Sequence, residues 1–80
     1  MRLPRDLSGS MLIRQLTKLG YTIDRQHGSH VRLTSHQGGE HHVTVPLHDP
    51  LRIGTLASIL GAVAAHHNIE RDDLLHRLLN

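Results

Sequence analysis

The tripeptide Gly28-Ser29-His30 stands where a segment of alternating apolar and polar residues begins. Histidine ordinarily titrates with a pKa of about 6.5, so its imidazole can take up and release a proton near neutral pH. A tight turn before a strand holds such a ring more firmly than a loose loop would. The chain contains no cysteine, which leaves no thiolate site. His30 is therefore the main candidate for acid–base chemistry.

Charged side chains near His30 would suit the cleavage of a phosphodiester. An imidazole that deprotonates an attacking hydroxyl or protonates the leaving group accelerates such a step about 10²–10⁴-fold. Arg32, two residues on and facing the same side, would stabilise the charge that develops on the phosphate. Asp24, expected opposite His30, would orient the ring and favour its protonated form. Gly28 and Ser29 would support His30 by forming the turn.

The overall charge is compatible with a polyanionic partner. The chain has nine Lys and Arg against seven Asp and Glu, and nine histidines add a reserve of positive charge. Tyr21 is the single aromatic residue, so RNA would be bound through its backbone and shape rather than by base stacking. The basic residues expected to contact phosphates are Arg2, Arg5, Lys18, Arg25 and Arg32.

Hydrophobic periodicity predicts the elements that position these side chains. They are a helix over about 8–19, strands over about 21–26, 30–34 and 42–45, a helix over about 54–66 and a short third helix over about 70–79. Ser8 or Ser10 would cap the first helix, and Gly20 would end it. Pro46 would end the third strand, because it has no amide to donate. The predicted architecture is a single α+β domain over residues 1–80, with helices on one face of a three-stranded antiparallel sheet.

The first two strands are predicted to form a hairpin. The residues Gln26-His27-Gly28 fit a three-residue loop, a type I turn with Gly28 in the left-handed position. Each strand is expected to be half-buried, and a slip of one residue would turn Val31 outward, so the apolar faces have to match. These rules place Arg25 opposite Ser29 and Asp24 opposite His30.

The register of the second and third strands follows from their valines and leucine. Matching Val31 with Val45 and Leu33 with Val43 aligns the apolar residues of both strands on one face. The other, open face would then carry Asp24, His30, Arg32, Thr34, His42 and Thr44.

The remaining histidines do not predict a metal site. His41 and His42 are adjacent in a strand, so they point to opposite faces. His66 and His67 are adjacent in a helix, where neighbouring side chains are poorly placed to share an ion. We therefore expect no metal and no cofactor. The histidines expected to be solvated surface groups are His27, His36, His41, His48, His66, His67 and His76.

The ordered set of motifs resembles the HicA toxin family. The similarity covers nearly the whole chain and rests on Leu12-Ile13-x-x-Leu16-x-x-Leu19-Gly20-Tyr21, Arg25-Gln26-His27-Gly28-Ser29-His30-Val31, His42-Val43-Thr44-Val45-Pro46 and Gly54-Thr55-Leu56-x-x-Ile59-Leu60. The resemblance implies a fold like that of double-stranded-RNA-binding domains. It also implies an mRNA-cleaving endoribonuclease, in which the histidine of the Gly-Ser-His motif, His30, is catalytic.

The same resemblance implies a HicB-type antitoxin as protein partner, together with a higher-order toxin–antitoxin complex. No apolar run approaches the roughly 20 residues that a membrane span requires, and the N-terminal residues lack an apolar signal core. We therefore expect a soluble, cytoplasmic toxin that cleaves mRNA without a metal. Two alternatives stay open: a non-catalytic RNA-binding module of the same fold, and a structural or partner-binding domain with no role in RNA.

Overall fold

The computed structural model describes residues 2–79 and contains three strands and three helices in that range. In chain order they are α1 (Gly9–Lys18), β1 (Thr22–His27), β2 (His30–Ser35), β3 (His41–Pro46), α2 (Ile53–His67) and α3 (Arg71–Leu79). Each end lies within one residue of its predicted position. The α+β fold class and its α-β-β-β-α-α order, like that of double-stranded-RNA-binding domains, are confirmed.

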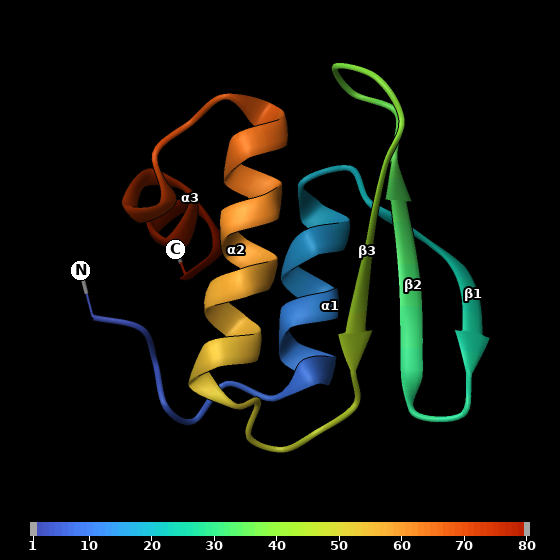
Figure 1. Cartoon of the computed structure of the whole chain (residues 1–80), viewed down its shortest axis with the longest axis vertical. Coiled ribbons are helices and arrows are strands. Elements are labelled where there is room, and N and C mark those ends of the chain that lie inside the picture. Colours follow the sequence, from blue (N-terminus) through green and yellow to red (C-terminus); the bar gives the residue numbers. More distant parts are fainter. Residues whose placement is uncertain (1, 80) are drawn as a thin grey trace.

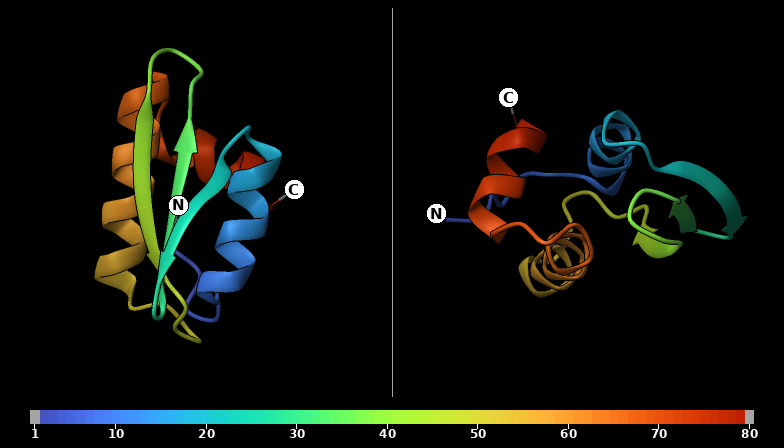
Figure 2. Two further views of the ribbon diagram at one scale, coloured as in Figure 1. Left: turned by 90° about the vertical axis from the view of Figure 1, so that its right-hand side faces the viewer. Right: turned by 90° about the horizontal axis from the view of Figure 1, so that it is seen from above.

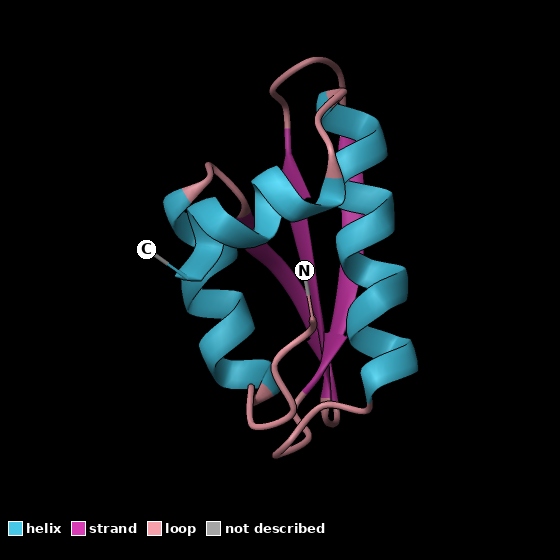
Figure 3. Cartoon of the chain, turned by 90° about the vertical axis from the view of Figure 1, so that its left-hand side faces the viewer, coloured by secondary structure: helices cyan, strands magenta, loops and turns pink. Residues whose placement is uncertain are grey.

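The elements form layers, with the sheet at one side of the molecule. The strands are antiparallel in the order β1-β2-β3. Helices α1 and α2 lie side by side on one face of the sheet (Figure 1). From the helix side, α3 crosses in front of α1 and α2 (Figure 3). The opposite face of the sheet carries no helix among the described residues (Figure 2).

Local signals define both ends of α1. The hydroxyl of Ser8 accepts a hydrogen bond from the backbone N–H of Met11 at 3.1 Å, so Ser8 is the N-terminal cap. Gly20 has a φ of +99°, which a residue without a side chain adopts most easily as the chain leaves the helix. The chain then turns back, and the backbone N–H of Tyr21 donates to the carbonyl of Leu16 at 3.1 Å.

Leucines from all three helices and the inner face of the sheet belong to one hydrophobic core. Leu12 and Leu16 of α1, Leu60 of α2 and Leu74 of α3 are fully buried, and Val45 of β3 is buried with them. Burying one such side chain stabilises a fold by about 1.5–3 kcal/mol. The third helix therefore belongs to the same core. Leu75 and Leu78 of α3 are buried as well, whereas Leu79 is 48% exposed.

Strand β1 differs from the prediction because it is exposed on both faces. All six of its residues are exposed, and the side chain of Ile23 is 58% exposed. The expectation of a half-buried strand is therefore wrong for β1. The helices pack over β3, whereas β1 makes its main contacts with β2. Figure 2, seen from above, shows β1 extending beyond the helical layer.

The register of the β1–β2 hairpin also differs from the prediction. His27 pairs with His30, so the loop contains two residues, Gly28 and Ser29, instead of three. Gly28, at the first loop position, has a φ of +59°, as the type II′ turn of short hairpins requires. The expected pairs of Arg25 with Ser29 and of Asp24 with His30 are consequently wrong.

One extra residue in β1 shifts the register further along the hairpin. Ile23 pairs with Leu33 and Arg25 pairs with Arg32, so Asp24 is left without a partner on β2. Such an irregularity is a β-bulge, which bends a strand and redirects its side chains. In contrast, the predicted register of β2 with β3 is confirmed at every pair, including Arg32 with Thr44.

A glycine in α1 allows the helix to begin close to the end of β3. A side chain at Gly9 would collide with the carbonyl of Pro46, and the N–H of Gly9 donates to the carbonyl of His48 at 2.9 Å. We expect Gly9→Ala to destabilise the protein by about 1–3 kcal/mol, because the helix must move away from β3. Urea unfolding gives the free-energy change.

Gly61→Ala is the matched control, because Gly61 lies inside α2 and a methyl group there meets no atom within 4 Å. In a helix interior, alanine is more favourable than glycine by about 0.5–1 kcal/mol, so this variant should be stabilised. Equal effects of the two substitutions would show that the contact at Pro46 is unimportant.

Candidate active site

His30 is the first residue of β2 and lies on the open face of the sheet. Val31 and Leu33 are buried on the helix side, so alternation directs His30 and Arg32 to the other side. The imidazole of His30 is exposed, and it has no hydrogen bond or ion pair with any residue between 2 and 79. Both ring nitrogens are thus accessible to a substrate.

Two hydrogen bonds hold the turn that precedes His30. The backbone N–H of Leu47, just after β3, donates to the carbonyl of Ser29 at 2.7 Å. The side-chain amide of Gln26 donates to the carbonyl of Gly28 at 3.0 Å. The turn is therefore fastened to the end of β3 as well as to β1. Gly28 and Ser29 form the two-residue turn that leads into His30.

Asp24 does not lie opposite His30. Its carboxylate oxygen Oδ2 accepts a hydrogen bond from the hydroxyl of Thr34 at 3.0 Å and lies 3.1 Å from Nε of Arg32. The latter contact is an ion pair by distance alone, because Nε of Arg32 has no aligned hydrogen-bond acceptor among the described residues. The position across from His30 on β1 belongs to His27.

The register of the hairpin decides which basic side chains of β1 face outward. Directly paired residues in an antiparallel sheet point to the same face, so Arg25 shares the open face with Arg32, and His27 shares it with His30. Arg25 was not among the residues expected on the open face. Arg25 is exposed and has no ion pair within the described part of the chain. The guanidinium of Arg32, in contrast, is engaged by Asp24.

A polar network occupies the open face at the other end of the strands. His42 lies 2.7 Å from the hydroxyl of Thr34 through Nδ1 and 2.9 Å from the carboxylate of Glu40 through Nε2. The hydroxyl proton of Thr34 is donated to Asp24, so Thr34 accepts the hydrogen bond from His42. This network lines a shallow polar groove, formed by Thr22, Ile23, Asp24, Arg32, Thr34, His36, Glu40 and His42.

The other predicted phosphate contacts lie away from His30. Helix α1 begins beside Pro46, which pairs with His30, and it rises about 1.5 Å per residue. Lys18, at its last turn, is therefore displaced by more than about 13 Å along the helix from that end. Arg2 and Arg5 belong to the segment before α1, which runs on the helix side of the molecule (Figures 1 and 2).

A histidine cluster around Tyr21 was missed by sequence reasoning. The hydroxyl of Tyr21 hydrogen-bonds Nδ1 of His41 at 2.8 Å and Nε2 of His67 at 3.0 Å. The ring of His41 stacks on that of His66, with centroids 4.3 Å apart and planes 8° from parallel. Nε2 of His66 donates to the carbonyl of Gln37 at 2.9 Å. These partners come from four separate segments, and no sequence spacing links them.

Burial and mutual repulsion shift the titration of this cluster. Desolvation lowers the pKa of His41 below 6.5, and the positive charges of His66, His67 and His42 lower it further. Desolvation also lowers the pKa of His67, with a contribution from His66. Burial raises the pKa of the Tyr21 hydroxyl. The expectation that His41, His66 and His67 are simple solvated groups is therefore wrong.

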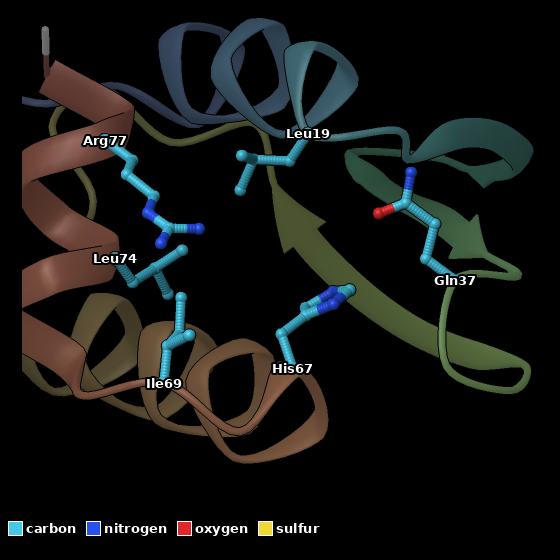
Figure 4. A pocket seen from close by; sticks show the side chains of 6 residues that line it. All are labelled: Leu19, Gln37, His67, Ile69, Leu74 and Arg77. Carbon is cyan, nitrogen blue, oxygen red and sulfur yellow. The ribbon is translucent and has the colours of Figure 1, made fainter.

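A small cavity of about 200 Å³ lies beside this cluster, where α1, α2 and α3 approach one another. Figure 4 shows the side chain of Arg77 directed into it between mainly apolar walls. Its lining residues are Leu19, Gln37, His67, Ile69, Leu74 and Arg77. Within residues 2–79, no group of three or more His, Cys, Asp or Glu is arranged to hold a metal ion.

A family model described as "HicA toxin of bacterial toxin-antitoxin" matches residues 9–64. The chain belongs to the HicA toxin family. The match spans α1, the whole sheet and most of α2, so it includes the hairpin that carries His30. Searches of curated proteins and of solved structures gave no match to this HicA-family chain. None of the described helices has the length and apolar character needed to cross a membrane.

The histidine cluster makes stability depend on pH in this HicA-family chain. His41 and His67 have lowered pKa values in the fold, so folding favours their neutral forms. Their contribution is complete above the unfolded pKa of about 6.5 and is lost as the pH falls through the lower folded values. We expect the free energy of unfolding, measured in urea, to decrease between about pH 7.5 and 5.5.

His67→Gln should show a smaller decrease over the same range, because one of the two titrating groups is gone. NMR titration of the wild-type protein should give midpoints below 6.5 for both rings. Stability that stays constant on acidification would contradict this account.

Proposed function

We propose that this HicA-family chain is the toxin of a type II toxin–antitoxin system and a metal-independent endoribonuclease that cleaves mRNA in the cytoplasm. His30 is its catalytic residue. The observation that carries the proposal is the placement of His30: an accessible imidazole at the tip of a hairpin whose turn is fastened to β3. Membership of a toxin family supports an activity at that site that is harmful to the cell.

In the proposed reaction, the 2′-oxygen of RNA attacks the adjacent phosphorus and the 5′-oxygen leaves. His30 either removes the proton of the attacking hydroxyl or supplies a proton to the leaving oxygen. Arg25 is well placed to bind the phosphate, because it is exposed on the same face without an ion pair in the described chain. Arg32 contributes positive charge, but it shares that charge with Asp24.

The shape of the molecule supports binding of RNA across the open face. The strands present polar and basic side chains there, and no helix of the described chain covers them (Figure 2). The single aromatic ring, Tyr21, is buried and bonded to histidines, so it offers no surface for base stacking. Contacts with phosphates and with the 2′-hydroxyl would then carry recognition.

A HicB-type antitoxin would inhibit the toxin by covering the open face and the ring of His30. Acidic residues on that partner would complement Arg25 and its neighbours. Such a complex can assemble to higher order through the antitoxin. Helix α3, beyond the family match, packs on the common core, which supports treating residues 1–80 as one functional domain.

The alternative is a non-catalytic RNA-binding module of the same fold. One observation favours it: Asp24 pairs with Arg32, so no carboxylate among the described residues orients the ring of His30. Both functions predict salt-sensitive RNA binding, since both use the same arginines. They differ in whether the phosphodiester bond is cut.

Cleavage of a long single-stranded RNA in EDTA separates the two functions. We expect wild-type protein to cut and His30→Ala to cut at least about 10²-fold more slowly, because the acid–base group is lost. RNA binding by His30→Ala should be largely retained. His76→Ala is the matched control, since His76 is an exposed histidine of α3, on the helix side of the molecule. RNA binding without cleavage by wild type would favour the non-catalytic module.

The role of Arg25 is tested by the salt dependence of RNA affinity, measured with His30→Ala to prevent cleavage. Adding Arg25→Ala should weaken binding about uniformly across sequences and reduce the slope of log K against log salt by about 0.7 for single-stranded RNA. Arg14→Ala is the control, because Arg14 is exposed on α1, in the helical layer. Identical slopes for all three proteins would place the phosphate contacts elsewhere.

A further inference from the structure

His27 lies directly across the hairpin from His30, an arrangement that exists because the loop has two residues. Directly paired residues have Cβ atoms about 4.5–5.5 Å apart and project to the same face. Both histidines are exposed, and neither side chain has a hydrogen bond or ion pair with the rest of residues 2–79. Two accessible imidazoles therefore stand side by side at the tip of the hairpin.

We propose that His27 and His30 act together on one phosphodiester, one as general base and the other as general acid. This inference rests on the proposed ribonuclease function and assigns the second proton-transfer group that the reaction needs. The two imidazoles would flank the phosphate, the base beside the 2′-hydroxyl and the acid beside the 5′-oxygen. Histidine suits both roles, because both of its protonation states are available near neutral pH.

The step balances in atoms, electrons and protons. The 2′-oxygen forms a bond to phosphorus while the bond from phosphorus to the 5′-oxygen breaks. The neutral imidazole takes the proton of the 2′-hydroxyl, and the protonated imidazole gives one to the departing 5′-oxygen. The products are a 2′,3′-cyclic phosphate and a 5′-hydroxyl end, and the histidines have exchanged protonation states. No metal or external reagent takes part.

His42, the third histidine on the open face, does not serve as the partner. It pairs with Thr34, four residues along β2 from His30, which corresponds to about 13 Å. Its two ring nitrogens are already engaged by Thr34 and Glu40. A group that transfers a proton must come within about 2.6–3.2 Å of its target. Only His27 of these two can reach the phosphate that His30 contacts.

The surroundings of the histidine pair suit an anionic substrate. Arg25 on β1 and Arg32 on β2 form the next pair along the same face. On β3, the residue paired with His30 is Pro46, which carries no charge. The titratable residues nearest in the chain beyond β3 are His48 and Asp49, which follow the Leu47 amide that bonds the turn. The negative groups Asp24 and Glu40 are held in the network farther along the strands.

The pH dependence of kcat/KM on a short RNA in EDTA tests the pair. We expect a bell-shaped profile for the wild-type protein, with one limb from each imidazole. His27→Ala and His30→Ala should each lose at least about 10²-fold and one limb, and the limbs lost should differ. His76→Ala, in α3 on the helix side of the molecule, should retain both limbs. Loss of activity only in His30→Ala, with an unchanged profile for His27→Ala, overturns the pairing and leaves the proposed ribonuclease intact.

A substrate with sulfur in place of the bridging 5′-oxygen assigns the two roles. A thiolate leaves without a proton, so the variant that lacks the general acid should be restored to within about tenfold of wild type. The variant that lacks the general base should remain slow. Restoration of both variants, or of neither, overturns the division into one acid and one base.

His27→Lys separates proton transfer from simple attraction of phosphate. Lysine keeps a positive charge, but it titrates near 10.4, far from an imidazole. We expect this variant to stay at least about tenfold below wild type and to lack the limb assigned to His27. Wild-type activity and an unchanged profile would show that His27 is only a cation. If no variant and no wild-type preparation cuts RNA, the proposed function itself fails, which is a different result.

Discussion

The pairing of β1 with β2 controls the chemistry available at the open face. Two local features set it: a two-residue turn that begins with Gly28 at positive φ, and a bulge that leaves Asp24 unpaired. The turn puts His27 beside His30. The same register places Arg25, two residues before His27, beside Arg32 on the same face. Counted from the turn, the bulge comes after Arg25 and leaves Asp24 unpaired. In the observed register the neighbour of His30 is the imidazole of His27, whereas the predicted register placed the carboxylate of Asp24 there.

The helical layer supports the hairpin indirectly, through the strand on which the helices pack. Helices α1 and α2 pack on β3, and α3 packs on both helices. The backbone hydrogen bond from the N–H of Leu47 to the carbonyl of Ser29 joins the hairpin turn to the end of β3. Strand β1 extends past the helices and exposes both faces. The candidate site is therefore carried by an exposed hairpin whose base belongs to the core. RNA, or a protein that competes with it, can approach the hairpin from more than one side.

Charge is distributed unevenly along the open face. Toward the ends of β1 and β2 that lie far from the turn, carboxylates of Asp24 and Glu40 compensate Arg32 and His42. Near the turn, His27, His30 and Arg25 have no compensating acid among residues 2–79. Exposed ion pairs of this kind contribute little to stability, so the network serves chiefly to organise charge.

The sequence by itself determined the helices and strands and the pairing of β2 with β3. Periodicity located all six elements, and the buried valines of β2 and β3 fixed their register, because a slip there would expose apolar side chains. It also singled out His30 as the candidate for acid–base chemistry, but it predicted a three-residue loop before this residue where the structure has two. Strand β1 has no buried face, so a slip in its pairing with β2 would expose no apolar side chain. Its residue pattern therefore does not fix its register, which only the tertiary structure decided. The contacts of Tyr21 with His41 and His67 likewise depend on segments that meet only after the helices pack on the sheet.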